Sequence, residues 1–234
     1  MNNDEINLTN DAYALHRILK TDIKRDPNVE EDEIIFGCGC FWGAEKCFWK
    51  LPGVITTSVG YAGGKKNNPT YYEVCSGLTG HSEVVRVIWD KREIDVSDLL
   101  KMFWECHDPT QKNRQGNDMG TQYRSAIYYK NENNIKTILA SKEQYQTELS
   151  KKNHGLIETE IKMIDSYFYA EQYHQQYLAS DGSRQYCSAS PTKVKLGFFN
   201  GSNYKLEDHI WENFNWEVDK CVLRSDNNPI KNNI

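Results

Sequence analysis

The sequence has no apolar run that approaches the length of a membrane span, and it has no excess of basic residues. The 234-residue chain carries 28 Lys and Arg against 33 Asp and Glu, so its formal net charge is −5. A membrane helix needs about 20 consecutive apolar residues, and a nucleic-acid-binding surface needs clustered positive charge. The composition excludes both kinds of partner, and we expect one well-cored domain that acts as a monomer.

The N-terminus lacks the basic start and the apolar stretch of a secretory signal. We therefore expect the chain in the cytoplasm, which is a reducing compartment. Seven cysteines in such a compartment are expected to be free thiols, because disulfides are rare there. Their odd number and irregular spacing also argue against a disulfide scaffold. One or two of them can be reactive, while the others serve as small buried apolar residues.

The chain divides into three parts by composition. Residues 1–31 are polar and charged, which predicts a flexible arm with a short helix near 12–20. Residues 32–190 carry strand and helix patterns and are predicted to form the catalytic domain. Residues 191–234 form a C-terminal extension made mostly of turns, with one helical stretch near 206–214.

Strands alternate with helices along the predicted catalytic domain. The predicted strands are 34–36, 54–61, 82–89, 125–129 and 157–164, and the predicted helices are 41–50, 71–75, 95–106, 131–152 and 171–178. This order predicts an α/β (α+β) two-layer sandwich, with helices packed on one mixed central sheet. Two long polar loops, 63–70 and 107–120, are typical of segments that bind a ligand.

One cysteine stands at the junction between the first strand and the first helix, in Gly39-Cys40-Phe41-Trp42-Gly43. A thiolate at Cys40 would be favoured by the helix dipole and the free N–H groups, and the two aromatic residues could wall an apolar recess. The alternative is a small buried cysteine at a tight turn. Cys38 and Cys40 raise the question of zinc, but no second ligand pair with suitable spacing exists, so we expect no metal.

Other clusters carry groups suited to proton donation or hydrogen bonding. Glu83 opens the most apolar strand, where burial would raise its pKa and make it a proton donor. The alternative is a plain charge at the end of a strand. Asp118 and Tyr123 lie in a glycine-containing loop, and Tyr71 follows an Asn-Pro-Thr turn, so each can present a directed polar group.

In this order the clusters closely resemble the peptide methionine-S-sulfoxide reductases of the A type. The resemblance rests on the motifs Gly39-Cys40-Phe41-Trp42-Gly43, Gly60-Tyr61-Ala62-Gly63-Gly64, Asn68-Pro69-Thr70-Tyr71, Thr79-Gly80-His81-Ser82-Glu83-Val84-Val85, Gly116-Asn117-Asp118, Gly120-Thr121-Gln122-Tyr123-Arg124-Ser125 and Ala170-Glu171-Gln172-Tyr173-His174-Gln175-Gln176-Tyr177-Leu178. It implies a two-layer sandwich wrapped by a long C-terminal coil. It also implies an oxidoreductase that reduces methionine-S-sulfoxide, free or in oxidised proteins, and so repairs them under oxidative stress.

The resemblance implies a role for each matching position. Cys40 matches the nucleophile, which becomes a sulfenic acid, and Glu83 matches the acid that protonates the sulfoxide oxygen. Tyr71 and Tyr123 match the phenols that hydrogen-bond this oxygen, and Asp118 matches a carboxylate that orders the site. The substrate's S-methyl group would be held by the residues that match Phe41 and Trp42.

The resemblance implies no bound cofactor, since thioredoxin, or dithiothreitol in vitro, returns the enzyme to its reduced state. Cys187 lies at about the position of the family's resolving cysteine. The glycine-rich stretch that commonly follows is missing, and Cys221 near the end of the extension is the candidate for passing the disulfide on. Cys38 is too close to Cys40 for an unstrained disulfide. The remaining three cysteines are expected to be packing residues: Cys47, Cys75 and Cys106.

Two other functions remain open from the residues alone. Cys40 could serve a cysteine-dependent hydrolase or acyltransferase, with His81 or His174 as the base. The thiol could also belong to a binding module without turnover.

Overall fold

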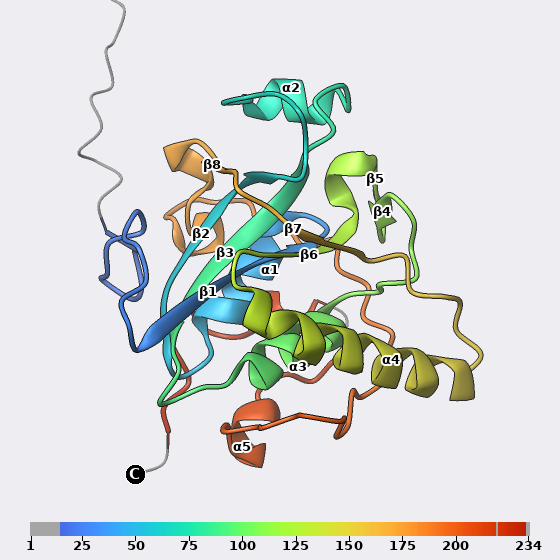
Figure 1. The fold of residues 1–234 in the computed structure, drawn as a ribbon. Coiled ribbons are helices and arrows are strands. Elements are labelled where there is room, and N and C mark those ends of the chain that lie inside the picture. Colours follow the sequence, from blue (N-terminus) through green and yellow to red (C-terminus); the bar gives the residue numbers. More distant parts are fainter. Residues whose placement is uncertain (1–14, 219, 233–234) are drawn as a thin grey trace, which may run out of the picture.

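A six-stranded mixed sheet lies at the centre of the computed structural model, which describes residues 15–218 and 220–232 (Figure 1). The strand order is β7-β6-β1-β3-β2-β8, with β6 and β7 parallel and the other neighbours antiparallel. The strands of this sheet are β1 Glu31–Cys38, β2 Val54–Ala62, β3 Ser82–Asp90, β6 Ser125–Tyr129, β7 Glu160–Met163 and β8 Tyr167–Tyr169. The helices are α1 Phe41–Trp49, α2 Tyr71–Cys75, α3 Val96–Cys106, α4 Ile135–Lys151, α5 Asp208–Trp211 and α6 Cys221–Arg224.

Helices α1, α3 and α4 cover one face of the sheet and enclose the main core with it. Alternation along β1 sends Ile34 and Phe36 into this core and Ile35 into a smaller cluster on the opposite face. Phe36 stacks on Phe48 of α1 and on Phe103 of α3, with ring centroids 4.8 and 5.1 Å apart. The predicted α/β two-layer sandwich is confirmed.

Buried carboxylates on α3 anchor the C-terminal extension. Glu105 accepts a hydrogen bond from the backbone N–H of Leu196 at 2.9 Å, and Asp98 accepts from the N–H groups of Lys205 and Leu206 at 3.0 and 3.2 Å. The extension also adds apolar side chains to the main core, namely Leu196, Phe199, Leu206, Ile210, Phe214, Trp216 and Val222. Its first part is therefore a coil with a fixed path, and α5 lies at the end of the molecule opposite to α2 (Figure 1).

The described part of the expected N-terminal arm packs onto the sheet. His16 is fully buried, with its Nε2 2.9 Å from Oγ1 of Thr57, and Ile23 is 2% exposed. Residues 15–20 form turns and a bridge to Asp22, where a short helix was predicted. Residues 1–14, which include the rest of that predicted helix and of the arm, lie outside the described residues. Desolvation at His16 lowers its pKa to about 3, so this buried ring is neutral.

The predicted helix over 171–178 is wrong: the segment forms two 3₁₀ turns, Gln172–His174 and Tyr177–Ala179. Gln176 between them adopts a left-handed conformation with φ of 47°, which no α-helix accommodates. Its backbone N–H and its side-chain amide both donate to Glu45 of α1, at 2.8 and 2.7 Å. These tertiary hydrogen bonds replace the helical ones.

Glu45 is a buried carboxyl that holds the coil after β8 against α1. It also accepts a hydrogen bond from Oγ1 of Thr57 at 3.0 Å, and burial raises its pKa to about 7. Glu45→Ala leaves the Gln176 donors unpaired in the core, so we expect a loss of about 2–4 kcal/mol in the free energy of unfolding. Urea unfolding checks this, with the exposed Glu143→Ala of α4 as a control within about 0.5 kcal/mol of wild type.

Candidate active site

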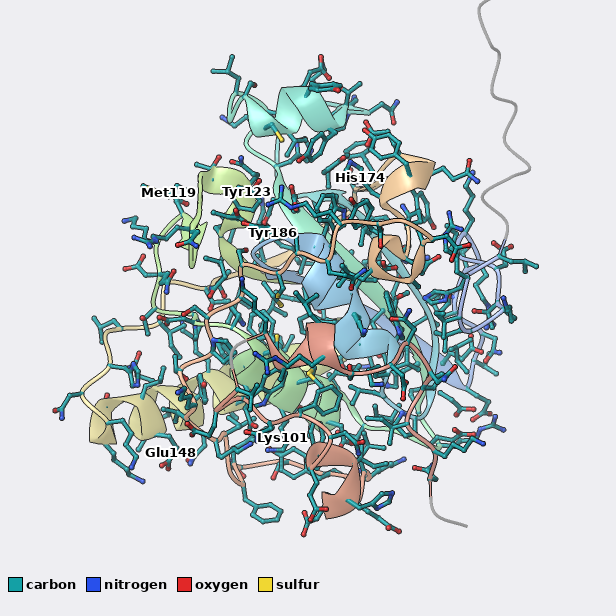
Figure 2. All side chains as sticks on the ribbon, turned by 180° about the vertical axis from the view of Figure 1, so that it is seen from behind. Lys101, Met119, Tyr123, Glu148, His174 and Tyr186 are labelled. Atoms are coloured by element: carbon teal, nitrogen blue, oxygen red, sulfur yellow. The ribbon has the colours of Figure 1, made fainter. Side chains whose placement is uncertain are left out.

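A cavity of about 320 Å³ opens beside the first turn of α1. It is lined by Cys40, Phe41, Trp42, Tyr71, Glu83, Asp118, Tyr123, Tyr177, Arg184 and Tyr186. All seven residues predicted from the sequence to act on or hold the substrate are among them. Figure 2 labels Tyr123 and Tyr186 of this lining, and His174 lies beside them. The fold brings together α1, α2, β3, the loop after α3 and the C-terminal coil.

Cys40 is the N-cap residue of α1, and it is half-buried. Burial raises the pKa of its thiol well above the usual value, the carboxyl of Glu83 raises this pKa further when it is ionised, and the backbone N–H of Trp42 acts in the opposite direction. Desolvation therefore outweighs the favourable effect of the helix terminus that the sequence indicated. At rest, Cys40 is a neutral thiol.

Glu83 is 2% exposed at the start of β3, and one of its carboxyl oxygens accepts a hydrogen bond from the backbone N–H of Phe41 at 3.1 Å. Burial raises the pKa of this carboxyl to about 8, and the neighbouring charge of Asp118 adds to the rise. The direction is the one that the sequence predicted. Below about pH 8 Glu83 holds a proton next to the Cys40 sulfur, so it can donate one.

Two phenols complete the polar wall of the cavity. Burial raises the pKa of both Tyr71 and Tyr123, so both keep their protons and can donate hydrogen bonds. Tyr71 is held by Glu171, which accepts its backbone N–H at 2.8 Å and the hydroxyl of Tyr61 at 2.7 Å. The backbone of Tyr71 is thus fixed before any substrate binds.

The aromatic wall is held by His174. The indole Nε1–H of Trp42 donates to Nδ1 of His174 at 3.1 Å, and the Trp42 ring stacks on Tyr177 with centroids 3.9 Å apart. The His174 ring also lies 5.1 Å from that of Phe41. Burial lowers the pKa of His174 to about 4 and its Nδ1 lone pair is occupied, so it does not serve as a base for Cys40. His81 does not line the cavity either, which removes the support for a cysteine–histidine hydrolase.

Sequence reasoning missed three lining residues: Tyr177, Arg184 and Tyr186. The hydroxyl of Tyr186 donates to a carboxylate oxygen of Asp118 at 2.6 Å, and the guanidinium of Arg184 lies 5.2 Å from the Tyr186 ring centroid. Tyr177 belongs to a motif of the family resemblance, but no role was assigned to it; Arg184 and Tyr186 belong to a coil without periodicity, so no local pattern marks them. The one available signal was the position of Tyr186 directly before Cys187.

Tyr186→Phe removes the hydrogen bond to Asp118 and leaves the ring in place. A hydrogen bond to a charged group contributes about 1.5 kcal/mol, so we expect kcat/KM for methionine sulfoxide to fall about tenfold. Steady-state kinetics with dithiothreitol measure this. Tyr72→Phe is the control, because Tyr72 is exposed on α2 and does not line the cavity. An unchanged kcat/KM in Tyr186→Phe would show that Asp118 needs no such partner.

Comparison with known proteins gives the family. Residues 32–205 match the family model "Peptide methionine sulfoxide reductase". The chain belongs to this family. It is 53% identical over 180 residues to the peptide methionine sulfoxide reductase MsrA of Vibrio vulnificus, covering 77% of this chain and 86% of that protein. It is 57% identical over 164 residues to the MsrA of Azotobacter vinelandii, covering 70% and 76% respectively.

A solved structure supports the same assignment. Methionine sulfoxide reductase A of Corynebacterium diphtheriae superposes with a TM-score of 0.67 at 42% identity, covering 78% of this chain and 88% of that one. The chain is thus an A-type methionine sulfoxide reductase, an oxidoreductase that reduces methionine-S-sulfoxide to methionine. Among its described helices, none combines the length and the apolar character that a membrane span needs.

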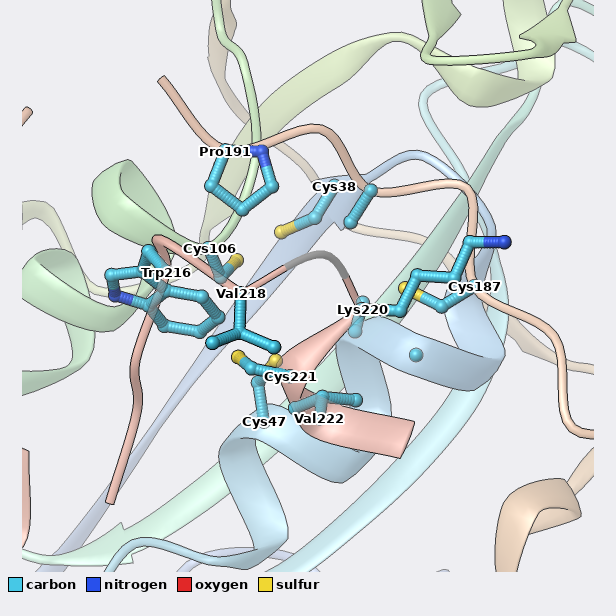
Figure 3. A pocket seen from close by; sticks show the side chains of 13 residues that line it. Cys38, Cys47, Cys106, Cys187, Pro191, Trp216, Val218, Lys220, Cys221 and Val222 are labelled. Carbon is cyan, nitrogen blue, oxygen red and sulfur yellow. The ribbon is translucent and has the colours of Figure 1, made fainter. Parts of the chain in front are cut away.

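All seven cysteines of this reductase are free thiols, and they fall into three environments. Cys40 faces the substrate cavity. Five others line a second cavity of about 20 Å³ on the other side of α1: Cys38, Cys47, Cys106, Cys187 and Cys221 (Figure 3). Cys75 is exposed on α2, so the prediction that it packs in the interior is wrong. Its helix has five residues and buries only Val74.

The described residues hold one group of possible metal ligands, in which the donor atoms of Cys38, Cys106 and His107 lie within 4.8 Å of one another. Both ring nitrogens of His107 already have partners, the carbonyl of Phe103 at 2.7 Å and the hydroxyl of Ser125 at 2.8 Å. The imidazole thus has no free lone pair to offer a metal ion, and its hydrogen bonds account for its burial.

Proposed function

We propose that Cys40 reduces the sulfoxide by direct attack on its sulfur. The Cys40 sulfur first bonds to the substrate sulfur, and the protonated oxygen then moves from the substrate sulfur to the Cys40 sulfur. The substrate S–O bond and the transient S–S bond both break, so methionine leaves and Cys40 becomes a sulfenic acid. Sulfur in the substrate is reduced by two electrons, and the Cys40 sulfur is oxidised by two. The placement of Cys40, Glu83 and two phenols in one cavity is the observation that carries this proposal.

Glu83 is the proton donor of this step. It protonates the sulfoxide oxygen, Tyr71 and Tyr123 donate hydrogen bonds to the same oxygen, and the proton that Cys40 loses restores the carboxyl. Each donor aimed at a developing charge contributes on the order of 2.7–4 kcal/mol in enzymes of other types. Asp118, fixed by Tyr186, orders the polar side of the cavity.

Phe41 and Trp42 form the recess for the S-methyl group. Their rings are held by His174 and Tyr177, so the recess has a fixed shape that fits the methyl of one epimer while its oxygen faces Glu83. Incubation with each epimer of methionine sulfoxide and dithiothreitol tests this. Only the S epimer should yield methionine, and equal rates with the R epimer would contradict the recess.

Recycling of the sulfenic acid is assigned to the C-terminal coil. Cys187 condenses with the Cys40 sulfenic acid to a disulfide and water, and Cys221 then passes the disulfide to thioredoxin, without a bound cofactor. The sulfur of Cys187 lies against Gly43, where a Cβ would come within 2.6 Å of it, and Gly43 is only one helical turn from Cys40. Thioredoxin-driven turnover should be lost in Cys187→Ser or Cys221→Ser; full turnover in both would refute the assignment.

The proposal also covers the domain organisation, the location and the substrates of the enzyme. Residues 32–190 form the catalytic domain, residues 1–31 and 191–234 flank it, and the enzyme acts as a cytoplasmic monomer. Its substrates are free methionine sulfoxide and oxidised proteins, which it repairs during oxidative stress.

A further inference from the structure

Five thiols surround one small cavity behind the active site, and the proposed recycling uses only two of them. The cavity holds about 20 Å³, which leaves room for little more than one water molecule between the walls. Figure 3 shows Cys47 of α1 beside Cys221 of α6, with Cys187 at the edge of the same cavity. Cys47 is 4% exposed and has no role in the steps described above.

Cys187 and the segment that carries Cys221 lie against different turns of α1. Cys187 lies at the first turn, because its sulfur occupies the space that a side chain at Gly43 would fill. The segment that carries Cys221 is fixed to the last turns of α1 by Lys46 and Trp49, which donate to the carbonyls of Ser225 at 2.7 Å and Asn227 at 3.0 Å.

Cys47 occupies the level between them. It follows Gly43 by four residues, so the two positions share one face of α1 with a rise of about 6 Å. It also directly follows Lys46, which holds the α6 segment. Burial raises the pKa of Cys187 and of Cys221 to about 12, and the neighbouring thiol of Cys47 raises the pKa of both further. Cys47 thus lines the same small cavity as both thiols, where it also lies beside the thiol of Cys106.

We infer that Cys47 is a fourth redox-active thiol, which takes the disulfide from Cys187 and hands it to Cys221. The inference rests on the proposed function, since Cys187 must first form its disulfide with Cys40. It explains how an oxidising equivalent passes from the buried Cys187 to the half-exposed Cys221, whose segment is held at the last turns of the same helix.

Two exchange reactions complete the transfer, and each conserves one disulfide. The Cys47 sulfur attacks the Cys187 sulfur, so the Cys47–Cys187 bond forms, the Cys40–Cys187 bond breaks, and Cys40 takes up the proton that Cys47 loses. The Cys221 sulfur then attacks Cys47, so the Cys47–Cys221 bond forms and Cys187 leaves as a thiol. A dithiol reductant finally attacks Cys221, reduces this disulfide and leaves as a disulfide itself.

Disulfide mapping in Cys221→Ser tests the first exchange. The reduced full-length variant is mixed with one equivalent of methionine-S-sulfoxide, quenched in acid, alkylated and mapped by mass spectrometry. We expect peptides linked through Cys47 and Cys187, with Cys40 alkylated again as a free thiol. A Cys40–Cys187 link at all times, with Cys47 fully alkylated, would overturn the inference and leave the proposed function standing. If no methionine forms at all, the proposed function itself fails, and the inference with it.

Turnover of Cys47→Ala tests the transfer as a whole. We expect its thioredoxin-driven rate to fall at least about tenfold, while its dithiothreitol-driven rate stays within about twofold of wild type. Cys38→Ala is the matched control, because it also removes a buried thiol from the same cavity, and both of its rates should stay near wild type. Equal thioredoxin-driven rates in Cys47→Ala and wild type would overturn the inference.

Discussion

Replacing Cys40 with serine will reduce methionine formation by at least about 10⁴-fold, because the hydroxyl cannot displace the sulfoxide oxygen and accept it as a sulfenic acid. The substitution exchanges one small polar atom at the N-cap of α1, and serine is a favoured residue at that position, so the fold will be retained. The measurement is methionine released from methionine-S-sulfoxide with dithiothreitol as reductant.

A matched variant separates the loss of the nucleophile from the loss of a thiol in general. Cys38→Ala alters a cysteine two residues away, which faces the cavity behind α1, and it should keep the dithiothreitol-driven rate. Substantial turnover by Cys40→Ser would show that another residue attacks the substrate and would overturn the mechanism.

Glu83→Gln will lower kcat by about 10²- to 10⁴-fold, the range for loss of a positioned general acid. The amide keeps the size of the carboxyl, its oxygen can still accept from the backbone N–H of Phe41, and its NH₂ group can still donate a hydrogen bond, so some activity will remain. Rates equal to wild type would show that Glu83 donates no proton. Glu143→Gln, an exposed change on α4, is the control.

The pKa of Glu83 also predicts how the activity changes with pH. The pKa of Glu83 is about 8, so the protonated form is complete below that value and is lost above it, and wild-type activity will fall as the pH rises past about 8. Glu83→Gln does not titrate and will lack this decline.

Stability follows from the same shift. The folded carboxyl binds its proton more tightly than the unfolded one, so wild type loses free energy of unfolding as the pH rises from 4.5 to about 8. Over this pH range, the free energy of unfolding measured with denaturant should fall for wild type relative to Glu83→Gln.

The sequence predicted the centre of the site because its groups sit on regular elements. Cys40 follows a short apolar strand and opens a helix, and Glu83 begins the most apolar strand, so both positions follow from local patterns. The strand and helix order predicted the sandwich for the same reason. Loop residues such as Asp118 and Tyr123 were found through the resemblance of whole motifs.

The features that escaped prediction depend on partners far away in the chain. The segment 171–178 breaks into two turns because Gln176 binds Glu45, which is 131 residues away. Tyr186 acquires its role from Asp118 across the cavity, and no periodicity marks such a contact. The raised pKa of Cys40 could not be predicted because burial and Glu83, both tertiary effects, outweigh the helix end. Local pattern carries no information about these long-range terms.

The neutral state of Cys40 determines how fast its thiol reacts with compounds other than the substrate. Peroxides and electrophiles react with thiolates, and their reaction with a protonated, half-buried thiol is slow. Because burial keeps the proton on Cys40, the thiol becomes a strong nucleophile only when a sulfoxide occupies the cavity and takes up the Glu83 proton, since the carboxylate can then accept the proton of Cys40. The free enzyme thereby protects its own nucleophilic sulfur from oxidation, and this sulfur reacts with methionine sulfoxide instead.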